Sequence, residues 1–172
     1  MKPARFPTIK ILLILHIVSF VYIRRQVKQG KAATRDIRLR KNFRASSSNR
    51  TLAGHSLDGL PGAYALFKHP DMFDNYILGS PSVWYNDNEI LQSATIKPSQ
   101  KVKVYLSVGN LEKPSFGEIQ DMVADAESLA KKINENKGEN ITLKFQIIEG
   151  ARHTTAFPST LVQGLDWIYG RN

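Results

Sequence analysis

Hydrophobic and polar residues follow patterns along residues 50–172 that predict strands and helices in turn. Residues 101–108 and 141–148 alternate apolar with more polar positions, which is typical of half-buried strands. Residues 118–136 repeat apolar positions at helical spacing, so an amphipathic helix is expected there. Its predicted buried side consists of Ile119, Met122, Val123, Ala126, Leu129, Ala130 and Ile133. Gly138 follows, where a C-terminal cap is expected.

Shorter segments complete the predicted order of elements. Residues 50–54 and 75–79 are short strand candidates, and residues 57–68 carry apolar side chains at helical spacing. One or two helical turns are expected at 87–93, and a final helix at 159–169. Strands that alternate with helices predict an α/β fold with a parallel sheet and right-handed crossovers. We therefore expect about four strands flanked by helices, with the two alternating strands toward an edge of the sheet.

The first 48 residues are expected to form a separate segment before a domain at 49–172. Residues 11–23 are apolar at all but two positions, but this stretch is shorter than the ~20 residues that span a bilayer. Its length suits the hydrophobic region of a signal peptide, yet no small residues follow as a cleavage site. A signal anchor or an interfacial helix is the alternative. Residues 24–50 are basic and polar, which indicates a linker or a disordered segment.

Charge is divided unequally between these two parts of the chain. Residues 1–50 contain 13 Lys and Arg and one acid, a net charge of +12, whereas residues 51–172 contain 11 and 14, a net charge of −3. A basic segment attracts anionic lipid surfaces, so a weak membrane-surface contact through residues 9–44 is one expectation. Nucleic-acid binding is not favoured, because no aromatic residues interleave with the basic ones. A cytoplasmic location is favoured, with anchoring or export through residues 11–23 as the alternative.

Several kinds of chemistry are disfavoured by what the sequence lacks. The chain has no cysteine, and hence no disulfide framework, thiolate metal site or cysteine nucleophile. Its four histidines show no metal-ligand spacing, and no glycine-rich phosphate loop is present. We therefore expect neither a metal nor another cofactor, and the pattern leaves the oligomeric state open.

A serine, an acid and a histidine occur in an order that favours nucleophilic catalysis. Gly54-His55-Ser56 closes a predicted strand and opens a predicted helix, as a nucleophile elbow does, and a helix N-terminus offers positive potential to an oxyanion. Glu112 follows the next-to-last strand, and His153 is expected in a loop directly after the last strand. The order Ser56, Glu112, His153 is that of α/β-hydrolase triads.

Four stretches of the chain resemble the putative-esterase family of α/β-hydrolases, which includes siderophore esterases and relatives of esterase D. The stretches are NRTLAGHSLDGLPGAYALFKHPDMFDNYILGSPSVWY (49–85), YLSVGNLE (105–112), MVADAESLAKKI (122–133) and FQIIEGARHTTAFPSTLVQGLDWIYG (145–170). The resemblance implies an incomplete α/β-hydrolase fold, the C-terminal half only. It also implies hydrolysis of carboxylic esters through an acyl-serine, with a siderophore or a small aryl or alkyl ester as the small-molecule substrate.

The resemblance further implies a role for each candidate site residue. Ser56 would be the nucleophile and His153 the general base and acid, with Glu112 as the acid of the triad. The backbone N–H of Leu57 would donate to the oxyanion. The substrate pocket would be bordered by His55 and Trp84. For Trp84, an ordinary half-buried aromatic side chain is the alternative.

The chain departs from the family pattern at the elbow and in its first residues. Asp58 stands where the family motif has the glycine that lets the helix approach the sheet, and its charge would disfavour a nearby oxyanion. Further departures are Pro61, Gly62 and Arg152. The family's earlier strands and its second oxyanion donor find no counterpart in residues 1–48, so an exposed sheet edge is expected. Two alternatives to an active esterase follow: a truncated, non-catalytic remnant whose first 48 residues are a frame-shifted reading, and a membrane-associated basic module.

Overall fold

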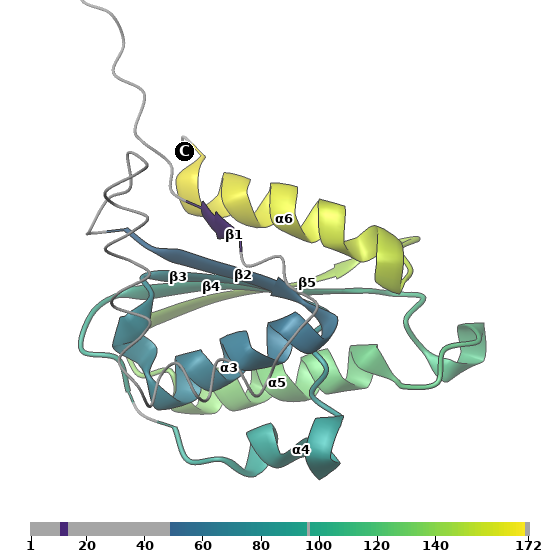
Figure 1. Cartoon of the computed structure of the whole chain (residues 1–172), viewed down its shortest axis with the longest axis horizontal. Helices are drawn as coiled ribbons and strands as arrows, with labels where there is room; N and C mark the ends of the chain where they lie inside the picture. The colour runs from purple at the N-terminus through teal and green to yellow at the C-terminus, as the bar shows by residue number, and fades with distance from the viewer. Residues whose placement is uncertain (1–10, 14–48, 96, 171–172) are drawn as a thin grey trace, which may run out of the picture.

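The computed structural model describes residues 11–13, 49–95 and 97–170, which form a parallel sheet with helices on both faces (Figure 1). The sheet has the order β1-β2-β3-β4-β5, and every pair of neighbouring strands is parallel. Its strands are β1 (Ile11–Leu13), β2 (Thr51–His55), β3 (Asn75–Gly79), β4 (Val102–Gly109) and β5 (Ile141–Ile148). The α/β class and the four parallel strands expected after residue 48 are thus confirmed.

Helices connect the strands and cover the sheet. Single 3-10 turns, η1 (Ser56–Asp58), η2 (Pro70–Met72) and η3 (Pro114–Phe116), lie in the connections. The α-helices are α3 (Gly59–Lys68), α4 (Tyr85–Gln92), α5 (Met122–Asn136) and α6 (His153–Tyr169). Figure 1 shows α3 and α5 on one face of the sheet and α6 on the other, with α4 beyond α5.

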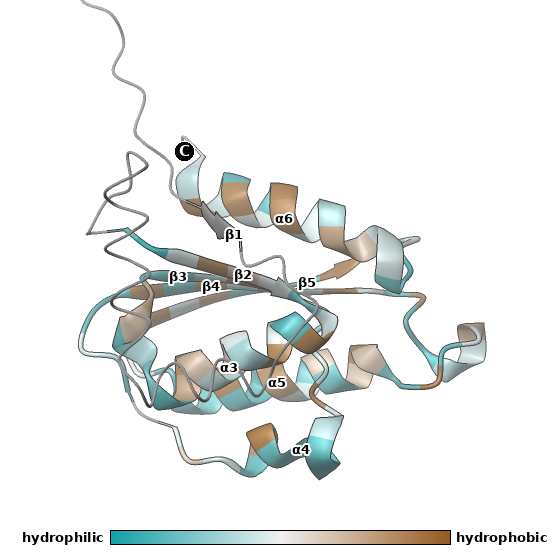
Figure 2. Ribbon diagram, viewed as in Figure 1, coloured by the Kyte–Doolittle hydropathy of each residue, from teal (hydrophilic) through white to brown (hydrophobic). Residues whose placement is uncertain are grey.

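The core lies on both faces of the sheet because successive strand side chains point in opposite directions. In β3, Tyr76 and Leu78 join the larger cluster, under α3 and α5, whereas Ile77 between them packs with Ile168 on the side of α6. Figure 2 shows hydrophobic colour along the middle strands and hydrophilic colour on the outer part of α4. Cover on both faces agrees with the burial of β2 and β3, in which four of the five β2 residues and all five β3 residues are buried.

The two long helices begin at different residues from those expected. The helix predicted from 118 starts at Met122, because the Asp121 carboxylate accepts the Ala124 N–H at 2.9 Å and caps the first turn. Ile119, expected on the buried side, is 91% exposed. The helix predicted from 159 starts at His153, despite Pro158 inside it. Local helix periodicity did not show these caps, so both starts were predicted wrongly.

The N-terminal segment contributes a strand where no family-like strand was expected. Ile11 to Leu13 pairs with Thr51 to Ala53 in parallel register. The expectation that this edge of the nucleophile strand is uncovered is therefore wrong over these three residues, since β1 supplies main-chain partners there. Residues 14–48, which hold the rest of the apolar stretch and most of the basic segment, lie outside the described residues. Among the residues described, no helix has the length and apolar character to cross a bilayer.

Candidate active site

Ser56 occupies a sharp turn between β2 and the helix that follows. Its φ of +58° lies in the left-handed region, which costs a non-glycine residue free energy and is found where surroundings enforce it. Gly54 makes the turn possible, because a Cβ there would lie 2.3 Å from the Asp58 carbonyl oxygen. The strand-turn-helix geometry expected of a nucleophile elbow is therefore present at the predicted residues.

Asp58 does not hold the helix away from the sheet. Its φ of −79° and ψ of −19° are ordinary for any residue in a right-handed helix, so its backbone does not require glycine. The close approach is made one residue later, at Gly59, where a Cβ would lie 3.0 Å from the Cα and Cβ of Pro81. Pro61 is buried within the first turn of α3, where its missing N–H would have no intrahelical acceptor.

The backbone after Ser56 carries donors in the first turn of a helix. Leu57 is the second residue of η1, and an N–H at that position has no acceptor within the helix. Leu57 as a whole residue is 55% exposed. The N–H of Leu57 is thus placed where a developing negative charge on a carbonyl oxygen could be stabilised, next to Ser56.

His153 and Glu112 form a direct hydrogen bond, with His153 Nδ1 2.6 Å from Glu112 Oε2. The carboxyl side chain is wholly buried, and the imidazole side chain is 31% exposed. His153 is the first residue of α6 rather than a loop residue as expected. This helix start is fixed by the Arg152 N–H, which donates to Thr155 Oγ1 at 2.9 Å as in one half of a capping box.

The other carboxylate oxygen of Glu112 accepts two hydrogen bonds from the protein. Ser80 Oγ donates to Oε1 at 2.7 Å, and the Gly109 backbone N–H donates to the same oxygen at 2.7 Å. Burial by itself would raise the pKa of Glu112, but the hydrogen bonds from His153, Ser80 and Gly109 outweigh it and lower this pKa. The carboxyl is therefore kept ionised beside the imidazole.

The two histidines of the site have opposite pKa shifts. The hydrogen bond to Glu112 raises the pKa of His153, against a smaller opposing effect of its partial burial. Burial, followed by the nearby His153, lowers the pKa of His55. The centroid of the His55 ring lies 4.5 Å from that of His153 and 5.1 Å from that of Phe157, with the ring planes tilted by 36° and 37°. His55 thus packs as a neutral ring against the candidate base.

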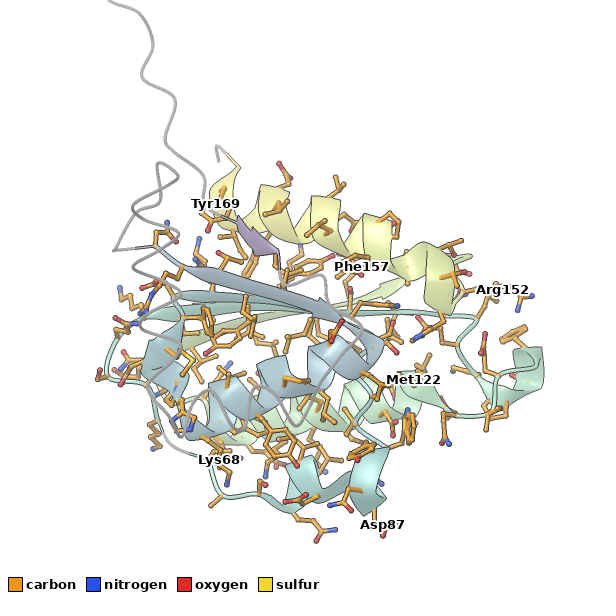
Figure 3. All side chains as sticks on the ribbon, viewed as in Figure 1. Lys68, Asp87, Met122, Arg152, Phe157 and Tyr169 are labelled. Atoms are coloured by element: carbon orange, nitrogen blue, oxygen red, sulfur yellow. The ribbon has the colours of Figure 1, made fainter. Side chains whose placement is uncertain are left out.

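The site is assembled at the carboxyl ends of the parallel strands, where ligands bind in open α/β sheets. Ser56 follows β2, Ser80 follows β3, and Glu112 and His153 follow β4 and β5. The loop after β3 is tied to the elbow by the Ser82 N–H, which donates to the Ser56 carbonyl at 3.0 Å. Figure 3 labels Phe157, Arg152 and Met122 at this end of the molecule.

Trp84 lies in the same loop and packs against residues of β4 and α5. Its partly buried side chain contacts the small apolar cluster formed by β4 and α5, and the backbone N–H of Trp84 donates to Asp125 Oδ2 at 3.2 Å. The contacts thus fit the half-buried aromatic interpretation, and its place beside a substrate pocket stays a prediction. In the described part of the chain, no three acidic or histidine side chains come together as metal ligands would.

Sequence reasoning missed Ser80. It directly follows a buried parallel strand, in Gly79-Ser80-Pro81-Ser82, and a polar residue at that position was the available signal. Its contact with Glu112 spans 32 residues of sequence, so only the register of β3 against β4 brings the two together.

The fold and the sharp turn at Ser56 place the chain in the class of α/β-hydrolase-like folds. A comparison with protein-family models matches the model "Esterase: Putative esterase" over residues 37–168. Because this match covers well over half of the chain, the protein belongs to this esterase family. The family resemblance predicted from the four sequence stretches is therefore confirmed.

Curated and solved relatives are similar over about half of their own length. The chain is 28% identical over 133 residues to the ferri-bacillibactin esterase BesA of Bacillus subtilis, covering 74% of this chain and 45% of BesA. The structure of the BES protein from Bacillus cereus superposes with a TM-score of 0.69 at 26% identity, covering 87% of this chain and 55% of that one. For the siderophore hydrolase EstB of Aspergillus nidulans the TM-score is 0.63 at 25% identity, with 87% and 57% covered.

Proposed function

We propose that this protein hydrolyses carboxylic esters of small molecules through an acyl-Ser56 intermediate. The observation that carries the proposal is the Glu112–His153 hydrogen bond at 2.6 Å, formed at the strand ends where Ser56 stands on its strained turn. A buried carboxylate that orients a partly exposed imidazole is the arrangement that activates a serine hydroxyl.

In the proposed mechanism, Ser56 Oγ attacks the ester carbonyl carbon while its proton passes to His153 Nε2. The ionised Glu112 stabilises the imidazolium that forms, and the Leu57 N–H donates to the oxyanion. When the tetrahedral intermediate collapses, the bond to the alcohol breaks and His153 gives the proton to the departing oxygen. Water then attacks the acyl-serine with His153 again as base, which releases the carboxylic acid and restores Ser56.

The substrate class proposed is a siderophore ester or another small aryl or alkyl ester. Support comes from the names of the relatives, a ferri-bacillibactin esterase and a siderophore hydrolase. The chain spans about half the length of these proteins, so their activity comes to it only as part of this proposal. Weak contact of residues 9–44 with a membrane surface stays a separate prediction, because most of that range lies outside the described residues.

The test is the hydrolysis of p-nitrophenyl acetate and of ferri-bacillibactin by the purified protein, beside Ser56→Ala and Ser82→Ala. Ser82 is a buried serine of the neighbouring loop, and its hydroxyl has no part in the proposed mechanism. We expect Ser56→Ala to lose at least roughly 10³-fold in kcat and Ser82→Ala to retain activity. Mass spectrometry after reaction with a fluorophosphonate should place the adduct on Ser56.

An absence of hydrolysis and of adduct in a folded parent protein would contradict the proposal and favour the non-catalytic alternative. Recovery of hydrolysis in Asp58→Gly would then locate the defect at the elbow, where Asp58 adds a negative charge two residues from Ser56.

A further inference from the structure

The carboxyl group of Glu112 is held from two directions that serve different purposes. Oε2 lies against His153 Nδ1, whereas Oε1 is bonded at 2.7 Å by both Ser80 Oγ and the Gly109 N–H. Ser80 and Glu112 have no exposed surface, so bulk water does not compete with the Ser80 hydroxyl for the hydrogen bond to Glu112 Oε1. The carboxyl can therefore turn away from His153 only by breaking bonds on its opposite side.

The backbone of Ser80 is held in a strained conformation beside Glu112. Its φ of +40° lies in the left-handed region, which is unfavourable for a residue with a Cβ. The strained turn is held by the Ser80 N–H, which donates to the Ser107 carbonyl oxygen at 2.7 Å. Strain of this kind persists only where the surroundings enforce it, and it gathers at sites that need a defined geometry.

We infer that Ser80 is a positioning residue of the proposed triad, whose hydroxyl anchors Glu112 Oε1 and so keeps Oε2 against His153 Nδ1. The inference rests on the function proposed above, because it gives Ser80 a purpose in activating Ser56. Ser80 acts through Glu112 and His153 and makes no contact with the reacting atoms in this proposal.

The hydroxyl of Ser80 has a consequence for protonation as well as for geometry. The Ser80 hydrogen bond helps to lower the pKa of Glu112 against the effect of burial, and Glu112 in turn raises the pKa of His153. The other titratable groups that act on His153 are His55, whose ring packs against it, and Glu118. Because those groups are unchanged by a substitution at Ser80, a shift of the His153 titration would report on Glu112.

The experiment compares Ser80→Gly and Ser80→Ala with the parent protein. Both substitutions remove the hydroxyl. Glycine adopts the positive φ of this position without strain, so Ser80→Gly should fold even if Ser80→Ala does not. Ser107→Ala is the matched control, since this buried hydroxyl bonds Thr160 Oγ1 at 2.7 Å and does not contact Glu112. The readouts are kcat and KM for p-nitrophenyl acetate across pH, and the titration of His153 followed by NMR.

We expect Ser80→Gly to lower kcat by about tenfold with little change in KM, as the loss of one hydrogen bond to a charged group would. We also expect the pKa of His153 to fall toward the ordinary 6.5, which moves the acidic limb of the activity profile to lower pH. Ser107→Ala should change neither kcat nor the pKa of His153. In a Glu112→Gln background, Ser80→Gly should lower kcat much less than it does in the parent protein, because the group that Ser80 anchors has lost its charge.

An unchanged His153 titration in a folded Ser80→Gly protein would overturn the inference, as would an equal loss of kcat in the Glu112→Gln background. The NMR titration does not require catalysis. A parent protein without esterase activity would therefore contradict the proposed function, while the titration would still decide whether Ser80 anchors Glu112.

Discussion

His153 Nδ1 lies 2.6 Å from Glu112 Oε2, and this bond joins the first residue of α6 to the loop after β4 across 41 residues of sequence. The carboxyl is wholly buried, while the imidazole side chain is 31% exposed. One member of the pair is thus protected from water and the other keeps surface that a substrate can reach. Charge and proton position at this pair lead to the first two predictions.

The activity of the protein should depend on the pKa of His153. A general base must be neutral, and Glu112 raises the pKa of this imidazole, so the acidic limb of kcat/KM should have its midpoint above 6.5. Glu112→Gln removes the charge that raises the pKa, so the midpoint should move to lower pH while the plateau falls by about 10²-fold. Rates measured from roughly pH 5 to 9 would show both effects. A limb that keeps its midpoint in Glu112→Gln would contradict the assignment of His153 as the base.

The same pair should make stability depend on pH within a defined window. Because folding lowers the pKa of Glu112, its carboxylate stabilises the folded protein above pH 4.5. This stabilisation is lost as the pH falls through the pKa of Glu112 in the folded state. Because folding raises the pKa of His153, its imidazolium stabilises the folded protein fully below pH 6.5. This stabilisation is lost as the pH rises through the pKa of His153 in the folded state. Glu112→Gln should therefore reduce the free energy of unfolding most between 4.5 and 6.5, by about 1–2 kcal/mol.

Urea denaturation at several pH values would measure this difference. Glu127→Gln, on the exposed side of α5, serves as the control, and it should leave the free energy of unfolding nearly unchanged across the same range. A stability loss in Glu112→Gln that is equal at every pH would indicate lost packing or neutral hydrogen bonding instead of a charge effect.

The charge of Asp58 should slow ester hydrolysis. Asp58 stands in η1, two residues after Ser56, and its carboxylate opposes the negative charge that develops on the substrate oxygen. Asp58→Asn keeps the size of the side chain and removes the charge, so kcat should rise by roughly two- to threefold at low salt. The gain should shrink at high salt because salt screens the charge of this partly exposed carboxylate. Equal gains at low and high salt would show that the substitution acts other than through the field of the carboxylate.

The turn at Ser56 should be intolerant of a larger residue at Gly54. A Cβ there would meet the Asp58 carbonyl oxygen at 2.3 Å and carbon at 2.7 Å, and these are backbone atoms that cannot move without moving α3. Gly54→Ala should therefore reduce the free energy of unfolding by about 2–3 kcal/mol. Gly138→Ala is the comparison, because its φ of +57° brings backbone strain but its nearest neighbour is 3.8 Å away. Gly138→Ala should reduce the free energy of unfolding by about 1–2 kcal/mol. A Gly54→Ala protein that is more stable than Gly138→Ala would contradict the steric argument.

Much of the fold could be predicted because strands and helices leave local patterns. The range of β3 was predicted residue for residue, and β4 to within one residue at each end, since burial of alternate or consecutive positions depends on the strand alone. The start of α6 at His153 was missed, because Pro158 disfavours a helix locally while Thr155 accepts the Arg152 N–H and fixes the first turn. A cap depends on side-chain geometry that periodicity does not record.

The sequence by itself determined the order of elements, the elbow at Ser56 and the succession of serine, acid and histidine after three parallel strands. These follow from local pattern and from the rule that parallel strands expose their carboxyl ends at one edge. Only the tertiary structure decided that β1 pairs with β2, that the His55 ring packs against His153 and that Ser80 donates to Glu112. Each of these contacts joins residues far apart in the chain, and its geometry depends on strand register and helix packing rather than on the residues near it in sequence.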